Sequence, residues 1–254
     1  MRVLVISDIH ANLQALEAVL QAAPSWDQVW NLGDIVGYGA NPNEVAQKAQ
    51  SLGGAIVRGN HDRACAGLAD LEDFSDAAAD AARWTQSILT AGNRSWLAGL
   101  PRGPIQRADL PVQLVHGSPL DEDEYIVSGN EAQAVLHAAG HAAGAKMTFF
   151  GHTHVQLGFA TNGDEDFRLA PLYSSASVAE SFELPLRRGA HYLLNPGSVG
   201  QPRDGDWRAA FGLFDDSREV FAWHRVPYDV AEAQRRIRRA GLPEFLAARL
   251  AKGQ

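Results

Sequence analysis

The chain has 254 residues, 46% of them hydrophobic and 20% charged, a composition typical of a globular protein and not of a disordered one. Its net charge of −8 argues against binding to a long nucleic acid, because phosphate neutralisation needs clustered Lys and Arg. The single cysteine, Cys65, excludes an internal disulfide, and no apolar stretch approaches the roughly 18 residues that span a bilayer. We therefore expect a cytoplasmic protein that does not associate with membranes.

The first part of the chain is predicted to alternate strands with helices. An apolar run followed by leucines at helical spacing, Leu13, Leu16 and Leu20, predicts a strand that leads into a helix. The predicted strands are residues 2–7, 27–33 and 54–59. The helices between them are predicted at residues 11–23 and 43–51. This order predicts a parallel sheet with right-handed crossovers, followed by an alanine-rich helical stretch at 68–100.

The second part of the chain is predicted to be mainly antiparallel. Two more strands, 112–117 and 146–151, flank a predicted helix at 131–139. The strands predicted after Thr153 are residues 155–161, 190–195, 209–215 and 219–226, with little room for helices between them. A terminal helical pair begins at Asp229, and residues 162–189 receive no assignment. The simplest packing is a single domain, residues 1–254, with two apposed sheets.

Polar side chains follow five of the predicted strands at the point where each strand ends. These groups are Asp8 and His10, Asp34, the run Asn60-His61-Asp62, His116, and His152 with His154. Because the carboxyl ends of parallel strands meet at one edge of a sheet, we expect these side chains to lie close together. Turns and helix caps explain any one group but not all five. The sequence therefore predicts one polar site.

The residue types in this site are those of a divalent metal centre. Carboxylate, imidazole and amide ligands without thiolate suit a borderline-hard ion: Mn is the first expectation, with Fe, Zn, Co and Ni as alternatives. Seven of these nine side chains are counted as potential metal ligands, which is too many for one ion but suits two ions that share a bridging carboxylate. Sites with two metals are used for in-line displacement at phosphorus. A small phosphoester is therefore the expected substrate.

The motifs, in this order, resemble those of the calcineurin-like metallophosphoesterases. The resemblance to compact bacterial members extends through VGYG (36–39), VHGSP (115–119) and NPGSVGQPRDGD (195–206). It implies an α/β fold, a four-layer α/β/β/α sandwich of two mixed sheets flanked by helices. That architecture agrees with the strand pattern above.

The resemblance also implies a role for each site residue. It places the first metal on Asp8, His10 and His154, and the second on Asn60, His116 and His152, with Asp34 bridging them. A water activated by both ions would attack phosphorus. His61 would act as general acid or stabilise the transition state, and Asp62 would orient it. The flanking arginines, Arg58 and Arg63, are expected to be structural.

The substrate is less well defined by the sequence. Ser/Thr protein phosphatases would carry Asp-Arg-Gly where this chain has Gly37-Tyr38-Gly39, which counts against a phosphoprotein phosphatase. We predict a phosphodiesterase acting on small, including nucleotide, substrates. The alternatives are a phosphomonoesterase and a non-catalytic metal-binding scaffold, although the intact ligand set weighs against a scaffold. Arg203 is a candidate phosphate contact, and Asn12 is either a helix cap or a substrate contact. His137 and His141 are expected to be structural.

Overall fold

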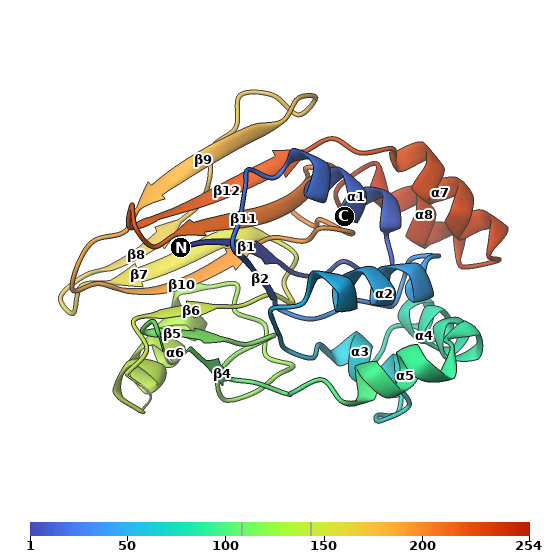
Figure 1. Ribbon diagram of the computed structural model, residues 1–254, viewed down its shortest axis with the longest axis horizontal. Helices are drawn as coiled ribbons and strands as arrows, with labels where there is room; N and C mark the ends of the chain where they lie inside the picture. Colours follow the sequence, from blue (N-terminus) through green and yellow to red (C-terminus); the bar gives the residue numbers. More distant parts are fainter. Residues whose placement is uncertain (108, 143) are drawn as a thin grey trace.

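Two six-stranded sheets lie face to face in the computed structural model of the chain (Figure 1). The structure describes residues 1–107, 109–142 and 144–254. The side chains of residues 137–142 lie outside the described part, so the prediction for His137 and His141 falls outside it as well. Among the described residues, no helix is both long and apolar enough to cross a membrane.

The first sheet contains the three strands that open the chain. Its order is β3-β2-β1-β11-β12-β9, in which β1, β2 and β3 are parallel and the remaining pairs are antiparallel. The strands are β1 (Arg2–Ile6), β2 (Gln28–Asn31), β3 (Ala55–Ile56), β9 (Glu180–Pro185), β11 (Ala209–Asp215) and β12 (Val220–Val226). The predicted parallel start and the mainly antiparallel second part are thus confirmed.

The second sheet has the order β4-β5-β6-β10-β7-β8, with β5, β6 and β10 parallel. Its strands are β4 (Ile105–Gln106), β5 (Val112–Leu114), β6 (Met147–Phe149), β7 (Gln156–Thr161), β8 (Asp166–Leu169) and β10 (His191–Pro196). The unassigned segment 162–189 supplies β8 and β9, one edge strand for each sheet. β9 alternates half-buried with exposed residues, the pattern of a strand covered on one face only.

Helices cover the outer faces of both sheets. Those packed on the first sheet are α1 (Leu13–Ala22), α2 (Pro42–Leu52), α7 (Val230–Arg239) and α8 (Glu244–Leu250). Beside them lie α3 (Asn60–Cys65), α4 (Asp76–Ile88) and α5 (Ala91–Ala98), whereas α6 (Gly129–Ala142) contacts the second sheet. The predicted four-layer sandwich is therefore confirmed (Figure 1).

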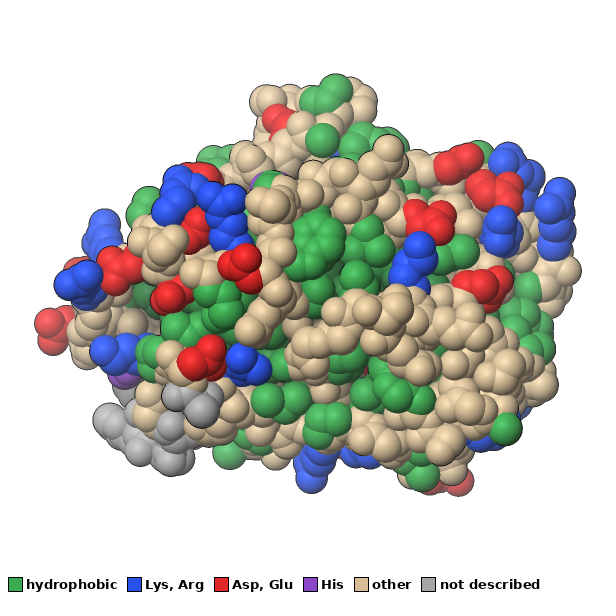
Figure 2. All heavy atoms as spheres, in the orientation of Figure 1, with side chains coloured by type: hydrophobic (Ala, Val, Ile, Leu, Met, Phe, Trp, Pro, Cys, Tyr) green, Lys and Arg blue, Asp and Glu red, His purple; other side chains and the backbone are tan. Residues whose placement is uncertain are grey.

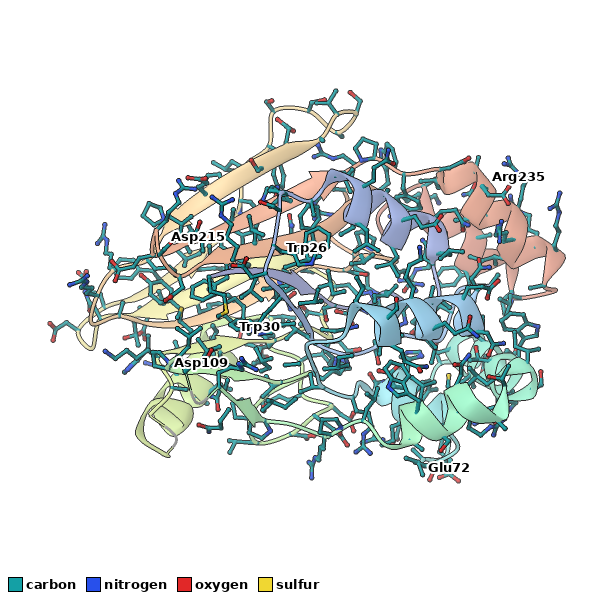
Figure 3. The ribbon with its side chains drawn as sticks, viewed as in Figure 1. Trp26, Trp30, Glu72, Asp109, Asp215 and Arg235 are labelled. Atoms are coloured by element: carbon teal, nitrogen blue, oxygen red, sulfur yellow. The ribbon has the colours of Figure 1, made fainter. Side chains whose placement is uncertain are left out.

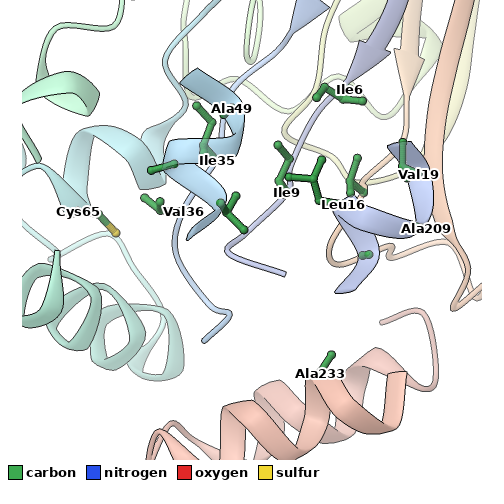
Figure 4. Close-up of a cluster of buried hydrophobic side chains, with 14 of the residues drawn as sticks. Ile6, Ile9, Leu16, Val19, Ile35, Val36, Ala49, Cys65, Ala209 and Ala233 are labelled. Carbon is green, nitrogen blue, oxygen red and sulfur yellow. The ribbon is translucent and has the colours of Figure 1, made fainter. Parts of the chain in front are cut away.

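The alternating side chains of β1 explain why the layers stack. Leu4 and Ile6 point into the cluster beneath the helices, part of which is drawn in Figure 4. Val3 and Val5 point instead into the inner cluster between the sheets. There Trp30, labelled in Figure 3, lies with its ring 5.4 Å from that of Phe149 in the second sheet. A strand buried on both faces needs a continuous apolar run, which residues 3–6, VLVI, supply.

Charged side chains of both signs are interspersed over the face shown in Figure 2. On α7, Arg235 and Arg236 both pair with Glu232, and Arg238 pairs with Glu244 of α8. Surface pairs of this kind contribute little to stability. They indicate that the arginines of α7 form a solvated helix face.

Candidate metal centre

The seven predicted ligands lie at the carboxyl ends of strands, but these strands belong to two sheets and not to one. β1, β2 and β3 contribute from the first sheet, and β5 and β6 from the second. The backbone N–H of Asp8 donates to Gly33 O at 2.9 Å, which joins the turn after β1 to the turn after β2. The site therefore spans the end of the sandwich, where both sheets present their carboxyl ends.

Five of the seven predicted ligands have a left-handed backbone. The φ angles are 53° for Asp8, 48° for His10, 55° for Asp34, 66° for His152 and 60° for His154. Residues other than glycine rarely adopt this region, and such strain concentrates at functional sites. The turns redirect each side chain from its strand end into the site.

At two positions, the absence of a Cβ in glycine makes space for the side chains of the site. A Cβ on Gly59 would collide with the Asp34 carboxylate, and one on Gly151 would collide with Ser7 Oγ and lie 3.0 Å from Asp8 Oδ2. Glycine is therefore required at position 59, where a Cβ would also meet the backbone N of Asp34, whereas a Cβ at position 151 would force the Ser7 side chain to move.

The ligand atoms form two groups that share Asp34. One group is Asp8, His10, Asp34 and His154, and the other is Asp34, His116 and His152; within each group the atoms lie within 4.8 Å of one another. All of these side chains are at most 4% exposed. In the first group, Nε2 of His10 and Nε2 of His154 are 3.0 Å apart. Two nitrogen ligands about 2.0–2.1 Å from one ion would be separated by about 3.0 Å at a right angle and by about 3.4 Å at the tetrahedral angle. The spacing therefore fits a common ion.

Asn60 belongs with the second group. It is the first residue of α3, and its Oδ1 lies 3.3 Å from Nε2 of His116. An amide oxygen is a neutral ligand that needs no deprotonation. With Asn60, the structure brings all seven predicted ligands together.

Asp34 lies between the two groups. Its Oδ2 is 3.5 Å from Nε2 of His10 and also 3.5 Å from Nε2 of His116. Its Oδ1 accepts a hydrogen bond from the backbone N–H of His61. One carboxylate oxygen is therefore equidistant from a ring nitrogen of each group, which is the position a bridging ligand needs.

A main-chain carbonyl contacts the second ring nitrogen of each ligand histidine. Nδ1 faces Val36 O in His10 (3.2 Å), Leu32 O in His116 (2.7 Å) and Gln201 O in His154 (2.6 Å). In His152 it is Nε2 that faces a carbonyl, Asp123 O, at 3.1 Å. Because a carbonyl only accepts, the nitrogen facing it carries the proton and the other nitrogen is free to bind a metal.

The electrostatics of the site favour positive charge at its centre. Burial opposes ionisation of Asp8, yet His154, whose Nε2 is 3.3 Å from Asp8 Oδ1, holds the pKa of Asp8 below its usual range. Burial likewise opposes a charged His116, but Asp34 outweighs it and raises the pKa of His116 to about 10. Asp8 Oδ1 is buried without a hydrogen-bond donor in the described structure. Divalent cations would satisfy both carboxylates, so the residues fit such ions.

His61 lies beside the metal ligands at the wall of a cavity of about 710 Å³. The residue is 5% exposed, and its ring contacts the rings of Tyr38, at 4.3 Å between centroids, and Phe74, at 4.8 Å. Asn60, His152 and Arg203 line the same cavity. The structure thus places His61 where a ligand of the cavity would meet it.

The predicted orientation of His61 by Asp62 is wrong. Asp62 Oδ1 accepts hydrogen bonds from the backbone N–H groups of Ile35 (2.8 Å) and Val36 (3.1 Å), and Oδ2 accepts one from Gly59 (3.1 Å). Both oxygens are used by the backbone, so Asp62 organises the turn after β2 and caps α3 instead. The side chain of Asp62 is fully buried.

Asn12 caps α1, which is one of the two alternatives predicted for it. Its Oδ1 accepts from the backbone N–H of Ala15 at 3.1 Å, and its Nδ2 donates to Gly200 O at 2.9 Å and to Tyr228 Oη at 3.3 Å. These bonds occupy the oxygen and the amide nitrogen, and the residue is 5% exposed. The structure thus supports the helix-cap alternative for Asn12, and a contact between Asn12 and substrate stays a prediction.

Arg203 reaches the cavity from the loop after β10. Its Nη2 lies 3.0 Å from Gln201 Oε1 and 3.4 Å from Tyr38 Oη, and its guanidinium carbon is 5.8 Å from the centre of the Tyr38 ring. Tyr38 follows β2, where the protein phosphatase motif would have its arginine. In this chain, an arginine distant in sequence thus lies beside that position.

Sequence reasoning missed most of the cavity wall. Phe74, Tyr125 and Arg249 line it, and so do the carboxylate residues Asp70, Asp73 and Asp123. These residues lie in loops or near the C-terminus and share no motif. Beyond the motif residues, the sequence pointed to this wall only at Tyr38 and Arg203.

The chain is similar to known proteins over nearly its whole length. Residues 1–217 match the family described as the calcineurin-like phosphoesterase superfamily domain. An uncharacterized protein from Methanocaldococcus jannaschii is 33% identical over 257 residues, covering 98% of this chain and 97% of that protein. A metallophosphoesterase from Sphaerobacter thermophilus, known from a crystal structure, is 39% identical in sequence. Its TM-score is 0.85, and the match covers 100% of this chain and 99% of that protein. A hypothetical protein from Pyrococcus horikoshii has the same fold, with 20% identity and a TM-score of 0.78. The match covers 100% of this chain and 98% of that protein.

Proposed function

The chain belongs to the calcineurin-like phosphoesterase superfamily, and from this premise we propose that it hydrolyses small phosphodiesters with the help of two divalent cations. The proposed ligands of the first cation are Asp8, His10 and His154. Those of the second are Asn60, His116 and His152, and Asp34 Oδ2 is shared. When bound, the cations supply a water activated for attack on phosphorus and neutralise charge on the phosphoryl oxygens. Mn is the proposed ion.

His61 is the proposed proton donor to the leaving oxygen. Burial lowers the pKa of His61 to about 4, so the ring is neutral at pH 7 in the free protein. An anionic phosphate in the cavity would favour the protonated ring and raise this pKa. Arg203 is proposed to hold a non-bridging phosphate oxygen, because its guanidinium lines the cavity that His61 also lines.

The composition of the cavity wall is the observation that favours a diester. The volume, about 710 Å³, suits a small organic molecule and exceeds what a phosphate group alone would need. Phe74 and Tyr125 offer aromatic surface for a second ester substituent. The lining holds three aspartates, Asp70, Asp73 and Asp123, and as many arginines, Arg63, Arg203 and Arg249, so it offers no excess positive charge for the second charge of a monoester dianion. A diester carries one negative charge and two substituents, so it matches this wall better than a monoester does.

The test compares a bis-aryl phosphate with the corresponding mono-aryl phosphate. The protein is stripped of metal, reconstituted with Mn²⁺, and assayed for kcat/KM on both esters; parallel samples receive Zn²⁺, Co²⁺, Ni²⁺ or Fe²⁺. We expect higher kcat/KM for the diester and the highest activity with Mn²⁺. Preference for the monoester would replace the proposal by a phosphomonoesterase. Absence of turnover on both esters with every ion would favour the binding scaffold.

A further inference from the structure

The loop of residues 117–126, which connects β5 to α6, contains a buried glutamate. Glu122 is 6% exposed, whereas its neighbours Asp121 and Asp123 are exposed. A buried carboxylate is rarely found without charged partners, because desolvation of the charge is costly. The partners of Glu122 therefore indicate what the loop is held against.

Three arginines converge on Glu122. Arg58 Nη2 lies 3.1 Å from each of its two oxygens, Arg63 Nη1 donates to Oε1, and Arg102 Nε is 3.7 Å from Oε1. Arg58 follows β3, and Arg63 lies within α3, the helix that begins with Asn60. Removal of one partner from such a buried ion pair leaves an uncompensated charge. The contacts tie the 117–126 loop to the element that carries Asn60 and His61.

The residues that follow Glu122 contact a metal ligand. The main-chain carbonyl of Asp123 faces Nε2 of His152 at 3.1 Å, and the ring of Tyr125 lies over that of His152 with 3.9 Å between centroids. The side chain of Asp123 accepts a 2.7 Å hydrogen bond from Arg63 Nη2. The loop therefore determines which nitrogen of His152 is protonated and how its ring is turned.

We propose that Glu122 is a positioning residue for the second metal. By holding the 117–126 loop on Arg58 and Arg63, it fixes the Asp123 carbonyl that orients His152, and it fixes α3 with Asn60. Two of the three ligands that belong to the second ion alone thus depend on one carboxylate. His10, His154 and His116 have carbonyl partners outside this loop, at Val36, Gln201 and Leu32. The inference rests on the two-metal site of the proposed function, and it assigns a task to both arginines that flank Asn60-His61-Asp62.

The test measures the affinities of the two metal sites separately. Metal-free wild-type protein and the Glu122→Gln variant are titrated with Mn²⁺ by calorimetry, and their thermal unfolding is followed in parallel. We expect the wild type to bind two ions. In Glu122→Gln, the dissociation constant of the first should change little and that of the second should rise about 10–100-fold, the range found for outer contacts of metal ligands. Glu124→Gln, in the same loop but with no side-chain hydrogen bond among the described residues, is the matched control.

Two further variants keep the test decisive if Glu122→Gln does not fold. Arg63→Lys and Arg58→Lys retain the charge but lose the planar fork of donors, and each should weaken the second site alone to a smaller extent. Unchanged affinity for both ions with lowered thermal stability would overturn the inference and leave Glu122 a purely structural role. Equal weakening of both ions would overturn it as well. If wild-type protein itself bound no second ion, the proposed two-metal function would fail, and with it the inference.

Discussion

The backbone N–H of His61 donates a hydrogen bond of 2.9 Å to Oδ1 of Asp34. This bond occupies the oxygen of Asp34 that does not face the two ligand groups and leaves Oδ2 as the bridging candidate. It also holds the first turn of α3 against the site through the main chain. Substitutions at the two residues should therefore have separable effects, since the bond uses the side chain of Asp34 but only the backbone of His61.

Asp34→Asn should abolish occupancy by two metals. An amide has one oxygen, so the variant either keeps the bond to His61 N–H or presents an oxygen to the ions. We expect metal content to fall from two ions to one or none per chain, and turnover to fall at least about 100-fold. Mass spectrometry of dialysed protein, beside a rate assay, gives both values. Two retained ions with normal turnover would show that Asp34 does not bridge.

His61→Ala should keep both ions and lose turnover. The backbone N–H that contacts Asp34 is unchanged by the substitution, and the ring is not one of the seven proposed ligands. Loss of a general acid typically costs about 10²–10⁴-fold in rate. The same metal analysis and assay apply. An emptied site in this variant would contradict the assignment and make the ring a structural requirement for metal binding.

Arg203→Ala should weaken substrate binding. Loss of a hydrogen bond from a charged donor to phosphate costs about 1.5–3 kcal/mol, so KM for the diester should rise about 10–100-fold with a smaller change in kcat. Steady-state kinetics at saturating Mn²⁺ measures both constants. Arg235→Ala, on the outer face of α7 (Figure 3), removes an equally charged side chain and should change neither. An unaltered KM in Arg203→Ala would exclude the proposed phosphate contact.

Asn12→Ala should lower stability and leave the kinetics intact. Asn12 caps α1, and replacement of an asparagine cap by alanine costs about 0.5–2 kcal/mol. Urea denaturation of the metal-free protein should show this loss, and KM for the diester should equal that of the wild type. A raised KM at unchanged stability would restore Asn12 as a substrate contact.

His224 should make the stability of the fold depend on pH. Its ring stacks on Phe211 with 4.7 Å between centroids, and burial lowers the pKa of His224 to about 4. The unfolded chain binds the proton near pH 6.5, so between about pH 6.5 and 4 the unfolded state holds more protons and the free energy of unfolding falls as the pH falls. The full effect is at most about 3 kcal/mol.

The measurement for His224 is denaturant unfolding at pH 7.5 and pH 5, on wild-type protein and on His224→Gln. Subtraction of the variant removes the contribution of other groups that titrate in this range. The stability advantage of the wild type should be smaller at pH 5 than at pH 7.5. The same advantage at both values would mean that the folded His224 takes up its proton as readily as the unfolded one.

Local patterns in the chain predict two apposed sheets and the polar residues at the strand ends, whereas the four layers were implied by the family resemblance. The spacing of apolar residues alone predicts a strand at β1 and a helix at α1. The polar residues after β1, β2, β3, β5 and β6 are predicted to meet because strand ends of one direction gather at an edge. β9 was not predicted, because it is recognisable only by its pairing with β12, where Phe182 lies opposite Trp223.

Long-range contacts determine which atom of each side chain can bind a metal. The carbonyls that choose the ligand nitrogen of the four histidines lie 26 to 84 residues away along the chain, so no local pattern contains them. Asp62 and Glu122 likewise bond to groups far along the chain, Asp62 to the N–H groups of Ile35 and Val36 and Glu122 to Arg58 and Arg63. The residue types at the strand ends predict a metal site, because the strands themselves are recognised from local apolar patterns. The orientation of each group depends on backbone atoms that only the folded chain brings near.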